Sequence, residues 1–150
     1  ALLEKRGEKV AGQGIIEGYI HFNGRVGALV ELRTETDFVA KNPEFKKLAH
    51  EIALQIAAMN PKFINRESIP SEILESKKEE LMVDIKDKPD AVKEKILEGR
   101  LEKWFEEVCL LDQKYIKDEN LRIKDLIFNF ANKCGEKIEI RRFVRLSIND

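Results

Sequence analysis

The sequence predicts an α+β domain in which a small, mostly antiparallel sheet, formed by a hairpin and a C-terminal strand, packs with about four helices. Two segments with strand character flank a turn signal near the beginning of the chain. Segments with helical periodicity follow, and an alternating segment stands near the end. Because strands and helices do not alternate regularly, a doubly wound parallel sheet is not expected.

The predicted hairpin has its strands at residues 16–22 and 25–34. Asn23 and Gly24 lie between them, and both tolerate the positive φ angles of a two-residue type I′ turn. The second strand carries an apolar residue at every other position: Val26, Ala28, Val30 and Leu32. This alternation predicts that one face of the strand is buried.

The first predicted helix follows a short connection. Asn42 suits the N-cap of a helix and Pro43 suits its first position. Apolar residues then repeat at helical spacing as far as Met59, and Asn60 with Pro61 ends the helix.

Three further helices are expected at residues 70–86, 90–110 and 123–134. Each has an apolar stripe at helical spacing. Residues 117–120 are expected to form a loop before the last of these helices. Gly135 stands where a left-handed C-cap belongs.

The final predicted strand covers residues 138–148. Its apolar residues are expected to share one face: Ile138, Ile140, Val144, Leu146 and Ile148. Arg141, Arg142 and Arg145 form a basic cluster in this strand. They are either charges on an exposed face or edge that discourage unwanted pairing, or interface residues that meet a partner's carboxylates.

Composition excludes several classes of protein. The chain has 150 residues, and 27 lysine and arginine residues nearly balance 28 acidic ones, so the formal net charge is -1. That balance provides no cationic field for coating nucleic acid. The hydrophobic fraction of 43% is too high for a disordered chain, and no apolar run approaches the roughly 18–20 residues of a membrane span. We therefore expect a cytoplasmic domain with no nucleic-acid and no membrane partner.

No catalytic or cofactor motif is found. The sequence has no Walker loop, no GxSxG elbow and no HExxH pair. Cys109 and Cys134 lie in apolar segments, and His21 and His50 are isolated, so buried or structural roles are favoured over a disulfide or a metal site. We expect no metal, no cofactor and no enzyme.

Residues 36–42, Thr-Asp-Phe-Val-Ala-Lys-Asn, are unusual for a connection between a strand and a capped helix. In one interpretation, Thr36 caps a single helical turn and Phe38 packs into the local core. In the other, Phe38 is an exposed aromatic wedge beside the carboxylate of Asp37, the kind of anchor that dominates protein–protein interfaces. The residues alone leave both interpretations open.

Several blocks of the sequence follow one another in the same order as in a known protein family. They are Gly18–His21, Gly27–Leu32, Thr36–Asn42, Leu48–Ala49, Ile56–Ala57, Leu110–Gln113, Ile116–Asp118, Gly135–Ile138 and Arg141–Arg145. Over about residues 14–148 the chain thus resembles the bacterial elongation factor Ts family, the nucleotide-exchange factors for the GTPase elongation factor Tu. It departs at Gln113-Lys114-Tyr115, where the family usually has Gln-Pro-Phe.

The resemblance implies a mechanism and a site. In the family, the matching segment enters elongation factor Tu near the nucleotide, the phenylalanine wedges between helices, and magnesium is displaced. The implied site residues are Thr36, Asp37, Phe38, Val39, Ala40 and Lys41. Phe38 would be the wedge and Asp37 its polar partner, and the factor would bind elongation factor Tu in both its GDP-bound and its nucleotide-free form.

The resemblance also implies a domain organisation and an assembly. Residues 1–14 would be the remnant of a small ubiquitin-associated-like domain with its linker, and residues 15–150 the core of a short, homodimeric form. The dimer contact is expected near the last strand, at Arg142, Phe143, Val144 and Arg145. A competing class remains: a non-catalytic protein-interaction or RNA-associated module in which Phe38 belongs to the core.

Overall fold

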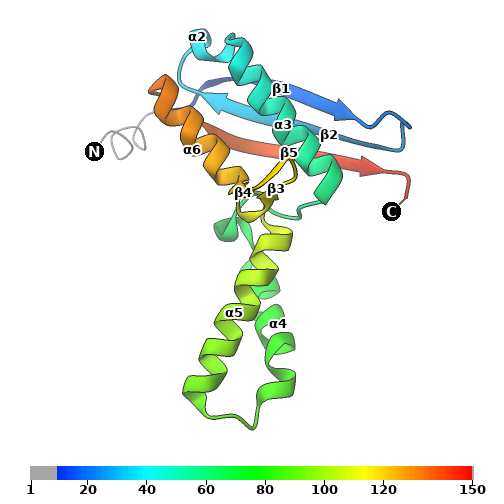
Figure 1. The fold of residues 1–150 in the computed structure, drawn as a ribbon, viewed down its shortest axis with the longest axis vertical. Coiled ribbons are helices and arrows are strands. Elements are labelled where there is room, and N and C mark those ends of the chain that lie inside the picture. Colours follow the sequence, from blue (N-terminus) through cyan, green and yellow to red (C-terminus); the bar gives the residue numbers. More distant parts are fainter. Residues whose placement is uncertain (1–9, 150) are drawn as a thin grey trace. The chain divides into compact units, whose positions relative to one another are not determined.

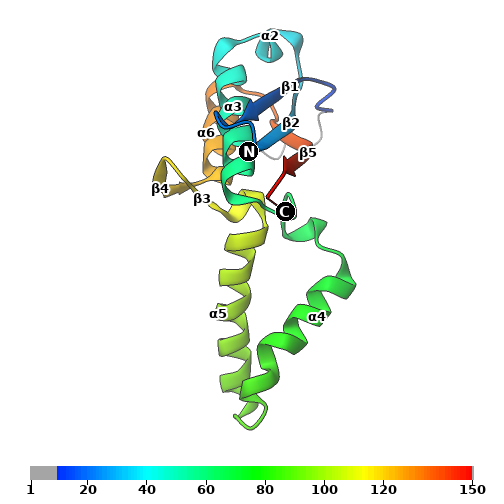
Figure 2. The same cartoon turned by 90° about the vertical axis from the view of Figure 1, so that its right-hand side faces the viewer.

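A computed structural model of the chain describes residues 10–149, which fall into two compact units (Figures 1 and 2). The sheet unit contains the described residues up to Asn60 and from Lys114 onward, and the helical unit is Pro61–Gln113. The α+β class predicted from the sequence is confirmed. Residues 1–9 of the predicted N-terminal remnant lie outside the described residues, and the predicted division at residue 14 stays a prediction.

The sheet unit is built on a three-stranded antiparallel sheet with the order β1-β2-β5. Helix α3 crosses one face of this sheet and α6 lies beside α3 (Figure 1). The elements of this unit are β1 (Gln13–Ile20), β2 (Val26–Thr34), α2 (Asp37–Ala40), α3 (Pro43–Met59), β3 (Lys114–Tyr115), β4 (Asp118–Arg122), α6 (Ile123–Cys134) and β5 (Glu139–Ser147).

The core of the sheet unit lies between β2 and α3. Val30 and Leu32 of β2 are fully buried, as the alternating pattern predicts, and they lie on the face that α3 covers with Phe45, Ile52 and other apolar residues. Burying each of these side chains contributes roughly 1.5–3 kcal/mol to folding. The opposite face of the sheet, which we call the open face, is not covered by α3.

The turn between β1 and β2 differs from the predicted two-residue type I′ turn. It spans His21 to Gly24, whose amide donates to the His21 carbonyl at 2.8 Å. Gly24 has φ = 71°, but Asn23 does not have the positive φ that a type I′ turn requires. The strands are therefore joined by a longer loop, residues 22–25, which is closed by the hydrogen bond from His21 N to Val26 O at 2.9 Å.

A bulge in β5 overturns the prediction that its apolar residues share one face. Leu32 pairs with Ile140 and Glu31 pairs with Arg142, so Arg141 is an extra residue in the ladder. One extra residue reverses the direction of every side chain that follows. Ile140 is buried on the face toward α3, whereas Val144 and the apolar residues after it are exposed on the open face.

Helix α3 confirms the end signals predicted for it. The Asn42 side chain accepts a hydrogen bond from Glu44 N at 2.8 Å, and Pro43 is the first helical residue. Asn60 ends the helix in the left-handed region with φ = 49° and ψ = 55°. Gly135, with φ = 77°, caps α6 in the same way, as predicted.

The predicted loop at residues 117–120 is wrong, because β3 and β4 form a small antiparallel hairpin there. Side chains of α3 hold this hairpin. The Gln55 amide donates to Lys114 O and accepts from Ile116 N, each at 3.0 Å, and Tyr115 donates to the Glu51 carboxylate at 2.9 Å. A strand as short as β3 has too little sequence pattern to be recognised.

The helical unit contains η1 (Arg66–Ser68), α4 (Ser71–Met82), η2 (Val83–Ile85), α5 (Asp90–Val108) and η3 (Leu110–Asp112). The predicted helix at 70–86 is thus an α-helix followed by a 3-10 turn, and the one at 90–110 ends at Val108.

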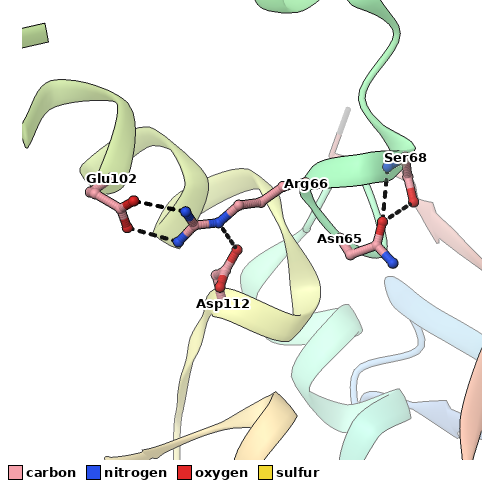
Figure 3. Close-up of polar contacts among 5 residues, drawn as sticks. All are labelled: Asn65, Arg66, Ser68, Glu102 and Asp112. Atoms are coloured by element: carbon pink, nitrogen blue, oxygen red, sulfur yellow. Dashed lines mark hydrogen bonds and ion pairs between the residues drawn. The ribbon is translucent and has the colours of Figure 1, made fainter. Parts of the chain in front are cut away.

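Arg66 joins three elements of the helical unit (Figure 3). Its Nε donates to Asp112 at 2.9 Å, and its two terminal nitrogens donate to the Glu102 carboxylate at 2.7 Å each. The guanidinium also lies 4.5 Å from the centre of the Phe105 ring. The carboxylates of Glu102 and Asp112 raise the pKa of Arg66 above its ordinary value, so Arg66 is a charged staple between η1, α5 and η3.

The two cysteines differ in exposure. Cys109 is buried, as predicted, and Cys134 is half-buried; neither cysteine forms a disulfide. Burial raises the pKa of the Cys109 thiol to about 11.

Candidate functional site

The segment 36–41 forms a one-turn helix, α2, directly after β2. Thr36 adopts an extended conformation and its Oγ1 accepts a hydrogen bond from Val39 N at 3.3 Å. The backbone closes the turn, because Ala40 N donates to Thr36 O at 3.2 Å and Lys41 N donates to Asp37 O at 3.0 Å. A helix of this length is not stable by itself, so its conformation depends on the surroundings.

Phe38 projects from this turn into solvent, with 84% of its surface exposed. Asp37 and Lys41 are exposed beside it and form an ion pair of 3.7 Å, while Val39 and Ala40 are half-buried. The interpretation that Thr36 caps a helical turn is therefore right, and the interpretation that Phe38 is a core residue is wrong. The ring of Phe38 is thus accessible to a partner, as an aromatic anchor of an interface must be.

Glu136 holds the base of α2. Its Oε1 accepts hydrogen bonds from Thr34 Oγ1 at 2.8 Å, Glu35 N at 3.2 Å and Thr36 N at 3.0 Å. Its Oε2 accepts from Thr36 Oγ1 at 2.6 Å. Partial burial by itself would raise the pKa of Glu136, but the hydrogen bonds from Thr36 and Thr34 outweigh it and lower the pKa below its ordinary value.

The open face of the sheet carries a second exposed apolar area. In the strand register, Gly18, Leu29 and Val144 lie side by side, and so do Ile20, Gly27 and Leu146. We call the exposed apolar side chains of this area the open-face patch: Ile16, Ile20, Leu29, Val144, Leu146 and Ile148. A groove of about 550 Å³ runs along the β5 side of the patch.

The basic cluster of β5 is engaged within the chain. Arg142 donates to Glu31 at 2.6 Å on the open face, and Arg141 pairs with Glu139 at 3.3 Å. Arg145 points the other way and donates to Ala57 O of α3 at 3.1 Å. The charges that the sequence presented as one cluster therefore lie on both faces of the sheet.

Two kinds of site are not found in the described residues. Residues 10–149 contain no group of three or more His, Cys, Asp and Glu side chains that could hold a metal ion. None of the helices in this part of the chain has the length and apolarity that a membrane span requires.

Comparison with known proteins decides the family. A family model described as Elongation factor TS matches residues 3–133. Elongation factor Ts of Thermotoga petrophila is 49% identical over 150 residues, which is 100% of this chain and 75% of that protein. Elongation factor Ts of Thermodesulfovibrio yellowstonii is 52% identical over 149 residues, 99% of this chain and 74% of that protein. The chain belongs to the elongation factor Ts family.

Membership of the elongation factor Ts family corrects one expectation. The prediction that the chain is not an enzyme is wrong, because an elongation factor Ts is a nucleotide-exchange factor for elongation factor Tu. Such a factor accelerates the release of a bound nucleotide, although it makes and breaks no covalent bond. A search for catalytic motifs misses this activity, because it is exerted through binding to another protein.

The elongation factor Ts fold brings some of the predicted site residues together and separates others. Residues 36–41 form one continuous turn around the exposed Phe38. Of the four residues predicted at the dimer contact, Arg142 and Val144 lie on the open face, whereas Phe143 and Arg145 are half-buried toward α3. The sequence reasoning missed Glu136, because only the fold brings it to Thr36, 100 residues earlier in the chain.

Proposed function

We propose that the chain is a guanine-nucleotide exchange factor that promotes the release of GDP from elongation factor Tu by inserting the segment around Asp37 and Phe38 near the nucleotide and magnesium site. The observation that carries the proposal is the 84% exposure of Phe38 on an otherwise anchored turn. In a chain of this family, an exposed apolar ring held in a fixed position makes the free energy of binding more favourable when a partner buries it.

Exchange couples two ligands of one protein, so factor and nucleotide weaken each other's binding by the same ratio. Burying one phenylalanine provides roughly 1.5–3 kcal/mol, which corresponds to about one to two powers of ten in affinity. A larger acceleration requires further contacts and the loss of magnesium–phosphate bonding. The factor therefore binds both GDP-bound and nucleotide-free elongation factor Tu in the cytoplasm, and it binds the nucleotide-free form more tightly.

The open-face patch supports a second part of the proposal, a homodimer. It is continuous across three strands, it is apolar, and Val144 and Arg142 of the predicted contact lie on it or at its edge. A second copy would pack against it face to face, in the manner of two stacked sheets. The dimer would hold elongation factor Tu through a surface beyond Phe38.

The deciding experiment measures the release of labelled GDP from elongation factor Tu in excess unlabelled GDP, with the wild-type chain and with Phe38→Ala. We expect acceleration by the wild type and a loss of about tenfold to a hundredfold of it in the variant. Phe22→Ala is the matched control, because Phe22 is 92% exposed at the other end of the sheet. No acceleration by the wild-type chain at any concentration would overturn the proposal.

The competing RNA-associated module predicts a different response to salt. Binding to a phosphate backbone weakens steeply as ionic strength rises, whereas burial of an apolar ring does not. Exchange that persists with little change from 50 to 300 mM salt would favour the apolar interface; these are about the concentrations over which counterion release is decisive.

A further inference from the structure

We propose that Glu136 is a positioning residue for nucleotide exchange, because its carboxylate fixes the turn that presents Phe38. The proposal deepens the proposed function and rests on it. Glu136 lies at the junction of α6 and β5, and α2 lies between β2 and α3. The two segments are far apart in the chain, so their connection is a property of the folded sheet unit.

The contacts of Glu136 concentrate on the residues that begin α2. A carboxylate that accepts several hydrogen bonds from backbone amides and hydroxyl groups fixes the positions of all their donors. Here the donors are Glu35 N, Thr36 N and the hydroxyl groups of Thr34 and Thr36, at 2.6–3.2 Å. The entry into the turn is therefore held at both its backbone and its side chains.

Thr36 transmits this restraint to the wedge. Its hydroxyl donates to Glu136 Oε2 at 2.6 Å, and the same oxygen accepts from Val39 N at 3.3 Å. Donating to a carboxylate orients the hydroxyl so that its lone pairs face the helix amide. Glu136 thereby stabilises the N-cap, and the N-cap holds the turn from which Phe38 projects.

A reciprocal contact anchors Glu136 itself. Glu35 Oε2 accepts a hydrogen bond from Lys137 N at 2.5 Å, so each of the two segments accepts a hydrogen bond from the backbone of the other. On one side of this pair, Gly135 ends α6 with φ = 77°, and on the other side Ile138 is buried in the core. The restraint on α2 thus comes from two well-packed elements rather than from a mobile loop.

The positioning role matters because a short turn has little stability of its own. Without its anchor, α2 would sample many conformations, and the partner would have to select the competent one. The apparent affinity and the rate of GDP release would then be reduced in proportion to the fraction of molecules whose turn has the competent conformation. In this role Glu136 contacts neither the nucleotide nor the magnesium ion; it acts through Thr36 and Phe38.

The first test measures the turn directly and does not require exchange activity. Amide hydrogen exchange is followed at Val39, Ala40 and Lys41 in the wild type and in Glu136→Gln, Glu136→Ala and Glu119→Gln. Glu119 is an exposed residue of β4 and serves as the matched control. We expect Glu136→Ala to increase exchange at these amides by about tenfold or more, since a hydrogen bond to a charged group shifts an equilibrium by that order. Unchanged protection would overturn the proposal.

The second test measures GDP release from elongation factor Tu as a function of the concentration of each variant. We expect Glu136→Ala to lower the acceleration about tenfold, Glu136→Gln to retain part of it because the amide oxygen still accepts hydrogen bonds, and Glu119→Gln to behave as the wild type. Adding Glu136→Ala to Phe38→Ala should cause little further loss, because both act through the same ring. A full additional loss in the double variant would overturn the positioning role.

The two tests separate the possible failures. If the wild-type chain does not accelerate GDP release, the proposed function fails, and the hydrogen-exchange result still decides whether Glu136 orders the turn. Thermal unfolding of Glu136→Ala shows whether the whole sheet unit is destabilised. If it is, Glu136→Gln becomes the decisive variant. The proposal would be overturned if Glu136→Gln had normal amide protection and normal GDP release, because the losses in Glu136→Ala would then result from unfolding.

Discussion

Arg142 of β5 lies opposite Glu31 of β2, and its Nε donates to Glu31 Oε1 at 2.6 Å. Arg33 donates to the other oxygen of the same carboxylate at 2.5 Å. Glu31 is thus held between two guanidinium groups on the open face, although it is itself nearly buried. Of the two roles that the sequence left open for this arginine cluster, Arg142 shows a third: it neutralises a carboxylate of its own chain.

This contact predicts a pH dependence of stability. The hydrogen bonds from Arg142 and then Arg33 lower the pKa of Glu31 below its ordinary value of 4.5. A carboxyl group whose pKa is lower in the folded than in the unfolded state stabilises the fold above about pH 4.5, and loses that contribution as the pH falls toward the folded pKa. We expect Glu31→Gln to lower the melting temperature at pH 7 and to flatten its decline below pH 4.5 relative to the wild type. If the melting temperatures of the two proteins fell in parallel from pH 7 to 3, this prediction would be contradicted. These pH limits bracket roughly the range in which such a carboxyl titrates.

Phe38 and Phe45 lie seven positions apart in the sequence, but truncation should destabilise the fold strongly at Phe45 and hardly at all at Phe38. Phe45 is fully buried in α3, so Phe45→Ala is expected to lower the free energy of unfolding by about 3–5 kcal/mol. Phe38 is exposed, so Phe38→Ala should change it by less than about 0.5 kcal/mol. Urea denaturation monitored by circular dichroism measures both. A strongly destabilised Phe38→Ala would show that its ring packs against the fold, and would remove the basis for its role as a wedge.

The contrast between these two phenylalanines shows how far sequence reasoning reaches. Phe45 belongs to a helical repeat with clear end signals, so its burial followed from periodicity. Phe38 has no periodic neighbours, and only the fold shows on which side of the capped turn its ring lies. The same limit explains the error in β5, where a single bulged residue at Arg141 reversed the faces. It also explains why Glu136 was missed, since long-range hydrogen bonds leave no local pattern.

Arg66 predicts a selective effect on the helical unit. Replacing Arg66 by Met removes its hydrogen bonds to Glu102 and Asp112 and its contact with the Phe105 ring. Because the guanidinium is partly exposed, solvent screening limits the loss to about 1–2 kcal/mol. The single tryptophan of the chain, Trp104, lies in α5 and reports unfolding of this unit by fluorescence.

Lys78→Met is the matched control for Arg66→Met. Lys78 makes an exposed ion pair with Glu75 at 3.4 Å within α4, and such pairs contribute less than about 0.5 kcal/mol. Equal effects of the two substitutions on the fluorescence-detected transition would show that Arg66 is an ordinary surface charge and not a staple.

The open-face patch predicts the assembly state. A stable interface buries about 800 Å² on each partner, and a face-to-face packing of two sheets would cover the apolar side chains of β1, β2 and β5 together. Leu146 is 74% exposed and lines the groove. We expect the wild type to be a dimer by sedimentation velocity at micromolar concentration, and Leu146→Glu to be a monomer, because an unpaired carboxylate in an apolar interface costs several kcal/mol.

Val83→Glu is the control for Leu146→Glu. Val83 is also an exposed apolar residue, but it belongs to η2 of the helical unit, so its substitution should leave the dimer intact. A wild-type chain that sediments as a monomer, or a Leu146→Glu chain that remains a dimer, would rule out this face as the contact.

If Leu146→Glu is a folded monomer, the rate at which it releases GDP from elongation factor Tu shows whether the partner subunit takes part in exchange. A normal rate would mean that the partner subunit takes no part in exchange, whereas a reduced rate would mean that elongation factor Tu is held by both copies, with Phe38 of one supplying the wedge.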